Sequence, residues 1–220
     1  MSAMKNEALM GVQMVIAMKG HPGTGKSTLA HALASSLRIP LIDKDDVRDS
    51  TFPLQSYLSP PPATATANPT ASKLLNDLSY QVIWQIALTQ LRLGLSVIVD
   101  SPLSRRSHLD RLLHLASLTG ACLVIVECKP SDEVEWRRRL ERRGSGAADD
   151  HRQEGAAGAW HKPSEWQDLE RLVEGYGGCT DYDVGHVPKL VVDTTAPVGL
   201  DQIASTVKAF LASHSHLHTP

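Results

Sequence analysis

The 220-residue sequence has few cysteines, and they are scattered along the chain. Cys122, Cys128 and Cys179 form no CxxC pair and no mixed cysteine and histidine metal spacing. A disulfide framework or a zinc site built on cysteine is therefore not expected. This composition fits a reducing compartment, and we expect an intracellular, cytoplasmic protein.

Long hydrophobic runs and a strong net charge are also lacking. The longest apolar stretch near the start, Val12 to Met18, is too short to cross a bilayer and precedes no small-residue cleavage site, so no membrane anchor is expected. The formal net charge of −2 gives the whole molecule no strong field to attract nucleic acid. His214, His216 and His218 lie in a polar tail without an evident fourth ligand, and we interpret them as solvated.

Hydrophobic residues (42%) and charged residues (21%) occur in the proportions of an ordinary globular protein. At this length we expect one domain spanning residues 1–220. Five short apolar segments are the expected strands: residues 12–20, Arg38–Ile42, Ser96–Asp100, Ala121–Glu127 and Lys189–Asp193. Because helical patterns separate them, the order predicts an α/β fold with a parallel sheet and helices on both faces.

Two helical patterns lie between the first three expected strands. One begins at Lys26, and a longer one ends near Gly94 with an apolar face formed by Leu75, Leu78, Val82 and Ile86. Two other stretches break the regular pattern. The proline-, alanine- and threonine-rich residues 59–70 predict an extended mobile loop, and the glycine- and alanine-rich residues 144–158 predict a second flexible segment.

The most specific motif follows the first expected strand. Residues 20–27 read GHPGTGKS and match G-x-x-x-x-G-K-[ST], a phosphate-binding loop, in its strand-to-helix context. Backbone N–H groups and the helix N-terminus hold phosphate oxygens there, Lys26 reaches the β- and γ-phosphates, and Ser27 is the expected Mg²⁺ ligand. The expected nucleotide-binding residues are Gly20, His21, Pro22, Gly23, Thr24, Gly25, Lys26, Ser27 and Thr28. The cofactors are therefore ATP and Mg²⁺.

The sequence lacks the motifs of other nucleotide-dependent classes of protein. The third expected strand ends at Asp100 and Ser101, without the glutamate that follows in many water-activating ATPases. The Asp-x-x-Gly and Asn-Lys-x-Asp motifs of GTPases are absent from the matching positions. Asp100 remains a candidate ligand of Mg²⁺ and of the substrate, or a structural residue.

Acidic residues and an arginine follow the second expected strand, in the sequence DKDDVR at residues 43–48. They should lie at the carboxyl edge of the sheet, beside the phosphate loop, where ligands bind in α/β folds. A carboxylate there can take the proton of a hydroxyl, and Arg48 can hold an anionic group of the acceptor. Alternatively, Asp45 or Asp46 only caps the next helix.

Residues 20–28, 44–48 and 97–100, in this order, resemble the P-loop kinases of the AAA_33, zeta-toxin and polynucleotide-kinase-like group, over about the first 145 residues. The resemblance implies a three-layer fold with strand order 2-3-1-4-5. It also implies that Asp45 is the general base and that Arg48 binds the acceptor.

The resemblance further implies a lid and substrate segment at about residues 130–186. Its arginine-rich stretch, residues 136–143 (WRRRLERR), should close over the transferred phosphate, and Arg138 and Arg142, one helical turn apart, are the preferred catalytic pair. Repeated arginines on a helix are also typical of a solvated face. Trp160 and Trp166 either stack on a ligand ring or pack in the core.

The sequence therefore predicts an ATP-dependent phosphotransferase that acts on a hydroxyl group of a small metabolite. One alternative is a kinase of 5′-hydroxyl nucleic acids or nucleosides, which the net charge does not favour. The other is a nucleotide-binding switch that has no acceptor.

Overall fold

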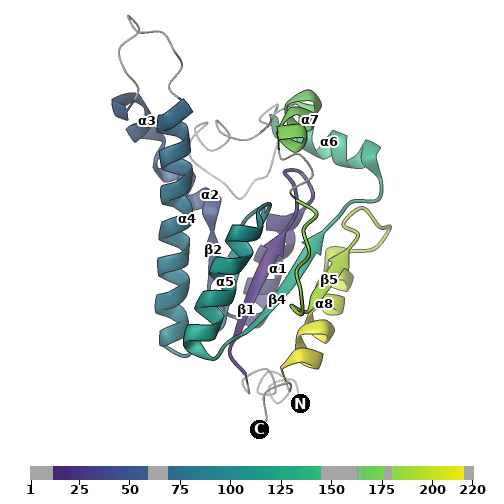
Figure 1. Ribbon diagram of the computed structural model, residues 1–220. Helices are drawn as coiled ribbons and strands as arrows, with labels where there is room; N and C mark the ends of the chain where they lie inside the picture. The colour runs from purple at the N-terminus through teal and green to yellow at the C-terminus, as the bar shows by residue number, and fades with distance from the viewer. Residues whose placement is uncertain (1–11, 59–68, 145–162, 164, 176–179, 216–220) are drawn as a thin grey trace, which may run out of the picture.

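A five-stranded sheet with helices on both faces forms the centre of the protein (Figure 1). The computed structural model describes residues 12–58, 69–144, 163, 165–175 and 180–215. The strands are β1 (Met14–Lys19), β2 (Leu41–Asp43), β3 (Val97–Asp100), β4 (Cys122–Cys128) and β5 (Lys189–Val192). All neighbouring strands pair in parallel, in the order β2-β3-β1-β4-β5. The expected fold class and strand order are confirmed.

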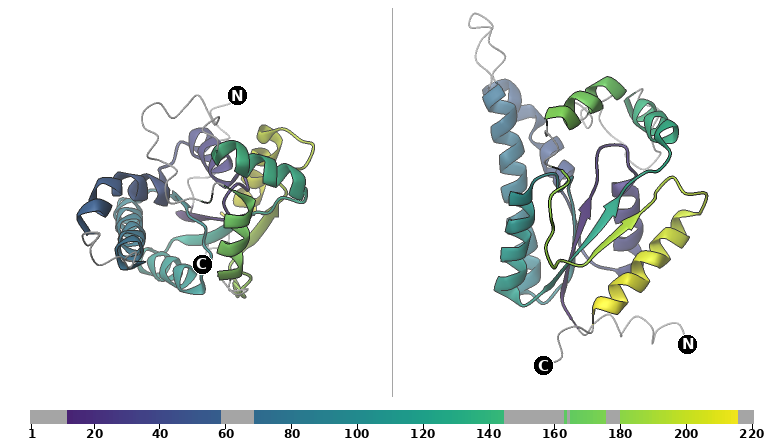
Figure 2. Two further views of the ribbon diagram at one scale, coloured as in Figure 1. Left: turned by 90° about the horizontal axis from the view of Figure 1, so that it is seen from above. Right: turned by 45° about the vertical axis from the view of Figure 1, so that its right-hand side comes forward.

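Helices connect and cover these strands. They are α1 (Lys26–Leu37), α2 (Lys44–Ser50), α3 (Phe52–Leu58), α4 (Pro69–Arg92), α5 (Arg106–Thr119), α6 (Glu133–Gly144), α7 (Trp166–Gly175) and α8 (Leu200–His214). Helices α4 and α5 lie on one face of the sheet and α1 and α8 on the other (Figures 1 and 2). No helix in the described part of the chain is long and apolar enough to span a membrane.

Alternating strand residues build a separate core on each face. In β1, Val15 and Ala17 pack with residues of α4 and α5, whereas Ile16 and Met18 pack with residues of α1 and α8. Every residue of β1 is buried. Strands buried on both faces read as continuous apolar runs, which explains why the sequence pattern located them.

Two expected boundaries were wrong. The second strand begins at Leu41 and not at Arg38, because Arg38 ends α1 in the left-handed region, with φ 55°. Helix α4 begins at Pro69, so the expected loop of residues 59–70 does not extend through Thr70. Residues 59–68 lie outside the described residues, as do residues 145–158 of the second expected flexible segment.

The expected apolar face of α4 was wrong in part, since Leu75 is buried as expected but other members are not. Its buried residues include Leu75, Ile83 and Leu91, whereas Leu78 is 41% exposed and Ile86 is 40% exposed. The helix contains more leucine and isoleucine than one face can bury, and its contacts with α2, α5 and β3 decide which face is buried.

The carboxyl edge of the sheet is the position of every candidate functional motif. The phosphate loop follows β1, the Asp43–Arg48 segment follows β2, and Asp100 ends β3. Asp43 and Asp100 are Cα partners in the β2 and β3 pairing. Helices α6 and α7, from the expected lid segment, lie above this edge (Figure 1).

Candidate functional site

The phosphate loop connects β1 to α1, and its glycines have backbone conformations that other residues rarely adopt. Gly23 has φ 79° and Gly25 has φ 78°, both in the left-handed region. A Cβ atom on Gly23 would lie only 3.2 Å from the indole nitrogen of Trp136. These glycines allow the loop to curl and Gly25 to cap α1, so the backbone geometry matches the sequence motif.

Lys26, the first residue of α1, forms an ion pair with Asp100 at the end of β3. The Asp100 side chain is fully buried, and its Oδ2 atom accepts no hydrogen bond from any described residue. Burial disfavours the charge of Lys26, but Asp100 outweighs it and raises the pKa of Lys26. The lysine therefore remains charged, and it lies at the N-terminus of α1.

The Oδ2 atom of Asp100, which lacks a hydrogen-bond donor in the described part of the chain, is suited to coordinate a cation. Ser27 follows Lys26 on the first turn of α1 and is half-buried. Among the described residues, no group of three His, Cys, Asp or Glu side chains is arranged for a metal ion. Mg²⁺ does not need such a cage, because it is usually held by one or two protein oxygens together with substrate phosphates and water.

Asp43 caps α2, since its Oδ1 atom accepts a hydrogen bond from the backbone N–H of Asp45 at 2.8 Å. The alternative that Asp45 or Asp46 caps this helix was wrong, because the N-cap residue is Asp43. Burial, together with the nearby Asp100 and Asp45 carboxylates, raises the pKa of Asp43 to about 7. Asp45 lies in the first turn of α2, with its Oδ1 atom 3.5 Å from Nζ of Lys44 and its side chain 26% exposed.

Arg48 is almost completely buried, at 1% exposure. Its guanidinium donates hydrogen bonds to Thr51 at 3.0 Å, Gln55 at 3.5 Å and Ser72 at 3.3 Å. These contacts join α2 to α3 and α4. Arg48 thus has structural partners within the chain, and its role in binding the acceptor stays a prediction.

Helix α6 contacts the phosphate loop through residues that sequence reasoning did not select. The indole N–H of Trp136 donates a hydrogen bond to the carbonyl oxygen of Pro22 at 2.8 Å. A Cβ atom on Gly25 would lie 3.5 Å from a terminal nitrogen of Arg139. Arg139 also donates to the carbonyl oxygen of Thr194 at 3.1 Å. The sequence motif offered no way to choose Arg139 among three consecutive arginines.

The preferred arginine pair lies farther out on α6. Arg138 is 61% exposed and makes two hydrogen bonds with Glu135, at 2.7 and 2.9 Å, and Arg142 is exposed. Their catalytic roles stay predictions. Trp166 packs edge-on against Trp136, with ring centroids 5.2 Å apart, and Trp160 lies outside the described residues.

The segment that follows β5 connects the phosphate loop to the residues just before α6. The hydroxyl of Thr194 donates to the carbonyl oxygen of Thr24 at 2.6 Å. Asp193 accepts hydrogen bonds from the backbone and hydroxyl of Ser131, which precedes α6, and from those of Thr195. These bonds hold the pKa of Asp193 well below its usual range. A displacement of α6 must therefore disturb this junction.

Comparisons with known proteins agree with this fold. The family model of an AAA domain, AAA_33, matches residues 15–162. A crystal structure of a "putative kinase" from Chloroflexus aurantiacus has a TM-score of 0.63 and 25% identity, covering 93% of this chain and 98% of that one.

Two further solved structures share the fold at lower identity. A gluconokinase from Sinorhizobium meliloti has a TM-score of 0.54 and 19% identity, with 93% of each chain covered. The APS kinase CysC of Mycobacterium tuberculosis, in complex with AMPPNP and APS, has a TM-score of 0.53 and 17% identity, covering 91% of this chain and 98% of that one. No curated protein sequence matches the chain significantly.

Proposed function

The chain belongs to the AAA_33 family of AAA domains, and from this premise we propose that it is an ATP-dependent kinase of a small metabolite's hydroxyl group. One observation carries the proposal. At the carboxyl edge of the sheet, the phosphate loop with its Lys26–Asp100 pair lies beside two further carboxylates, Asp43 and Asp45. A switch without an acceptor needs the loop, but it has no use for a general base.

The phosphate loop would bind the β- and γ-phosphates of ATP through backbone N–H groups of residues 23–28. Lys26 would transfer its contact from Asp100 to the phosphate oxygens. This exchange leaves the buried Asp100 carboxylate in need of a cation. Ser27 and Asp100 would hold Mg²⁺, which neutralises charge on the phosphates during transfer.

Asp45 is the proposed base. Its carboxylate would accept the proton of the acceptor hydroxyl as the hydroxyl oxygen bonds to the γ-phosphorus. The bond from that phosphorus to the bridging oxygen breaks, and ADP leaves with the electron pair. Arg138 and Arg142 would move with α6 to stabilise the charge on the phosphoryl group in transit.

An ADP-release assay with Mg·ATP tests the proposal against its alternatives. The acceptor arms are sugars, sugar acids, amino alcohols, nucleosides and a 5′-hydroxyl oligonucleotide. We expect one class of small metabolite to stimulate turnover at least about tenfold over the acceptor-free rate. Stimulation by the oligonucleotide alone would favour a nucleic-acid kinase. ATP binding without stimulation by any arm would favour a switch.

A further inference from the structure

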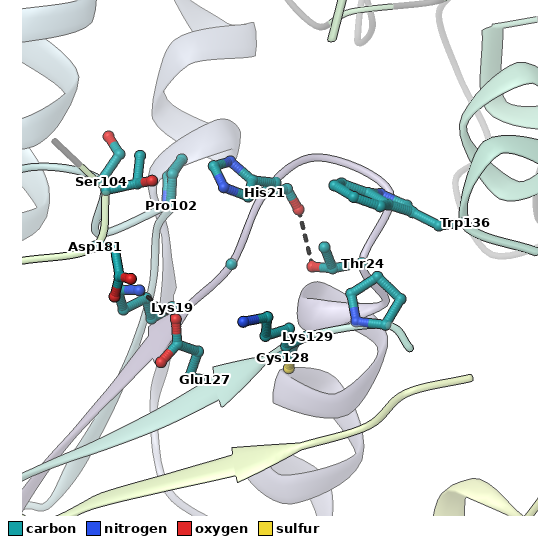
Figure 3. A pocket seen from close by; sticks show the side chains of 13 residues that line it. Lys19, His21, Thr24, Pro102, Ser104, Glu127, Cys128, Lys129, Trp136 and Asp181 are labelled. Carbon is teal, nitrogen blue, oxygen red and sulfur yellow. Dashed lines mark hydrogen bonds and ion pairs between the residues drawn. The ribbon is translucent and has the colours of Figure 1, made fainter. Parts of the chain in front are cut away.

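A cavity of about 280 Å³ opens beside the phosphate loop, and the mechanism above uses none of its lining apart from residues of the loop itself (Figure 3). Its walls come from the start of the loop, the segment after β3, the end of β4 and residues 180–181. It is close to the proposed reaction centre. The backbone N–H of Gly20 donates to the carbonyl oxygen of Pro102, which follows Asp100 by two residues, and both Gly20 and Pro102 line the cavity.

A buried ion pair gives the cavity a fixed polar wall. Lys19, at the end of β1, pairs with Glu127 at the end of β4, and their side chains are 9% and 15% exposed. Glu127 also lies 3.1 Å from Nζ of Lys189. Although burial alone would raise the pKa of Glu127, the two lysines lower it below its usual value, so the carboxylate is charged.

Both members of this pair retain hydrogen-bonding capacity. An ammonium has three donors and a carboxylate has about four acceptor positions, of which the contacts between Lys19, Glu127 and Lys189 use only part. Because the neighbouring strands hold both groups in place, they are preorganised for a ligand.

The charged residues that line the cavity balance one another. Lys19 and Lys129 contribute positive charges, and Glu127 and Asp181 contribute negative ones. His21 adds none at neutral pH, because burial and then Lys19 lower its pKa. The cavity therefore presents donors and acceptors together without a net charge. Hydroxyl groups match this wall because each one both donates and accepts hydrogen bonds. An anionic ligand would be repelled by the carboxylates, and a cationic ligand would be repelled by the ammonium groups.

We infer that this cavity binds the non-reacting part of the acceptor, and that the acceptor is an uncharged, hydroxyl-rich small molecule of the sugar or polyol class. Such an acceptor has no anionic group for Arg48 to hold, which departs from the role expected of Arg48. The guanidinium of Arg48 donates to Thr51, Gln55 and Ser72. Pro102 and Trp136 supply apolar walls for the C–H face of such a molecule. The volume lies just below the range of roughly 300–1,000 Å³ typical of drug-sized ligands, which favours a compact acceptor. The claim that the bound molecule is the phosphate acceptor rests on the proposed function, whereas the claim that the cavity binds a neutral polyol does not.

Binding measured without ATP tests the cavity alone. The probes are D-glucose, D-ribose and mannitol, with gluconate and glucosamine as charged counterparts of glucose. Asp181→Asn removes a charge from the lining, and Asp183→Asn makes the same change two residues away, outside the lining. By calorimetry or saturation-transfer NMR, we expect a neutral probe to bind at least about tenfold more tightly than its charged counterparts. Asp181→Asn should weaken it about fivefold or more, and Asp183→Asn by less than twofold.

Three results would overturn the inference: no neutral probe binds, a charged counterpart binds as tightly, or the two asparagine variants behave alike. Glu127→Gln is a second variant and should also lose binding, while Asp181→Asn keeps the test decisive if Glu127→Gln fails to fold. Turnover with Mg·ATP separates this inference from the proposed function. Probe binding without any transfer would contradict the kinase, whereas transfer to an acceptor insensitive to Asp181→Asn would contradict the cavity.

Discussion

The phosphate loop and the Asp43–Arg48 segment both follow strands at the carboxyl edge of the sheet, but they depend on different parts of the chain. In the loop, the backbone defines the site, because Gly23 and Gly25 adopt left-handed conformations that let the chain curl. In the Asp43–Arg48 segment, side chains define the site, and neighbouring carboxylates serve different purposes. Asp43 caps α2, whereas Asp45 lies near Lys44.

This difference explains what each sequence motif can reveal. A backbone site survives most changes around it as long as its glycines remain, so its motif is specific. A side-chain site depends on which carboxylate points toward the bound acceptor. That in turn depends on the position of the residue around the helix and on its burial. Four predictions can break or sharpen the comparison.

Lys26→Ala should have the largest effect, a loss of about 10²–10³-fold or more in turnover, because it removes the cation that meets phosphate charge. It should also destabilise the protein by about 3–5 kcal/mol, since fully buried Asp100 loses its partner. Turnover assays and chemical denaturation measure both effects. The control is Lys26→Ala combined with Asp100→Asn, which should recover stability and not activity. Wild-type turnover in a folded single variant would disprove the role of the loop.

Asp45→Asn should reduce phosphoryl transfer by about 10²–10⁴-fold while ATP still binds, because asparagine cannot accept the proton. The melting temperature should change little, since Asp43 and not Asp45 caps α2. Transfer rate, ATP affinity and melting temperature are measured on the same variant. A loss smaller than about tenfold would reject Asp45 as the base and direct the test to Asp43, Asp46 and Asp100.

Arg138→Ala and Arg142→Ala should each lower kcat by about tenfold and affect ATP affinity less, because the guanidinium acts mainly on the phosphoryl group in transit. Arg139→Ala is the matched comparison on the same helix. It should weaken ATP binding instead, since Arg139 already lies beside Gly25 and Thr194. Steady-state kinetics and ATP titration distinguish the two patterns. Unchanged kcat in both Arg138→Ala and Arg142→Ala would assign these residues to the solvated face.

The smallest effect concerns the pH dependence of stability without nucleotide. The pKa of Asp43 is raised in the folded protein, from 3.8 to about 7. Its contribution to stability is therefore present below about pH 4 and is lost as the pH rises through about 7. Asp43→Asn still caps α2 but cannot titrate. As the pH rises from about 4 to about 7, the melting temperature of the wild type should fall by a few degrees relative to that of Asp43→Asn. A constant difference would show that Asp43 ionises normally.

The sequence predicted the parallel sheet and the phosphate loop because continuous apolar strands and a glycine-rich turn depend on local chemistry. The strand order came from the resemblance to P-loop kinases. It did not predict that Asp43 caps α2 or that Arg48 is buried. The burial of Arg48 depends on how α2 packs against α4, which no local pattern reports. The cap is local, but a run of adjacent acidic residues does not show which of them accepts the bond. The contact between Thr194 and Thr24 joins residues far apart in the chain, so no local pattern could reveal it.

Product balance tests the central claim most directly. The wild-type protein, Mg·ATP and the best-binding polyol are followed by ³¹P NMR, with Lys26→Ala as the control. The account predicts one new phosphate monoester for every ADP formed, and neither product with Lys26→Ala. ADP that accumulates only with inorganic phosphate, or bound ATP that is never turned over, would contradict it.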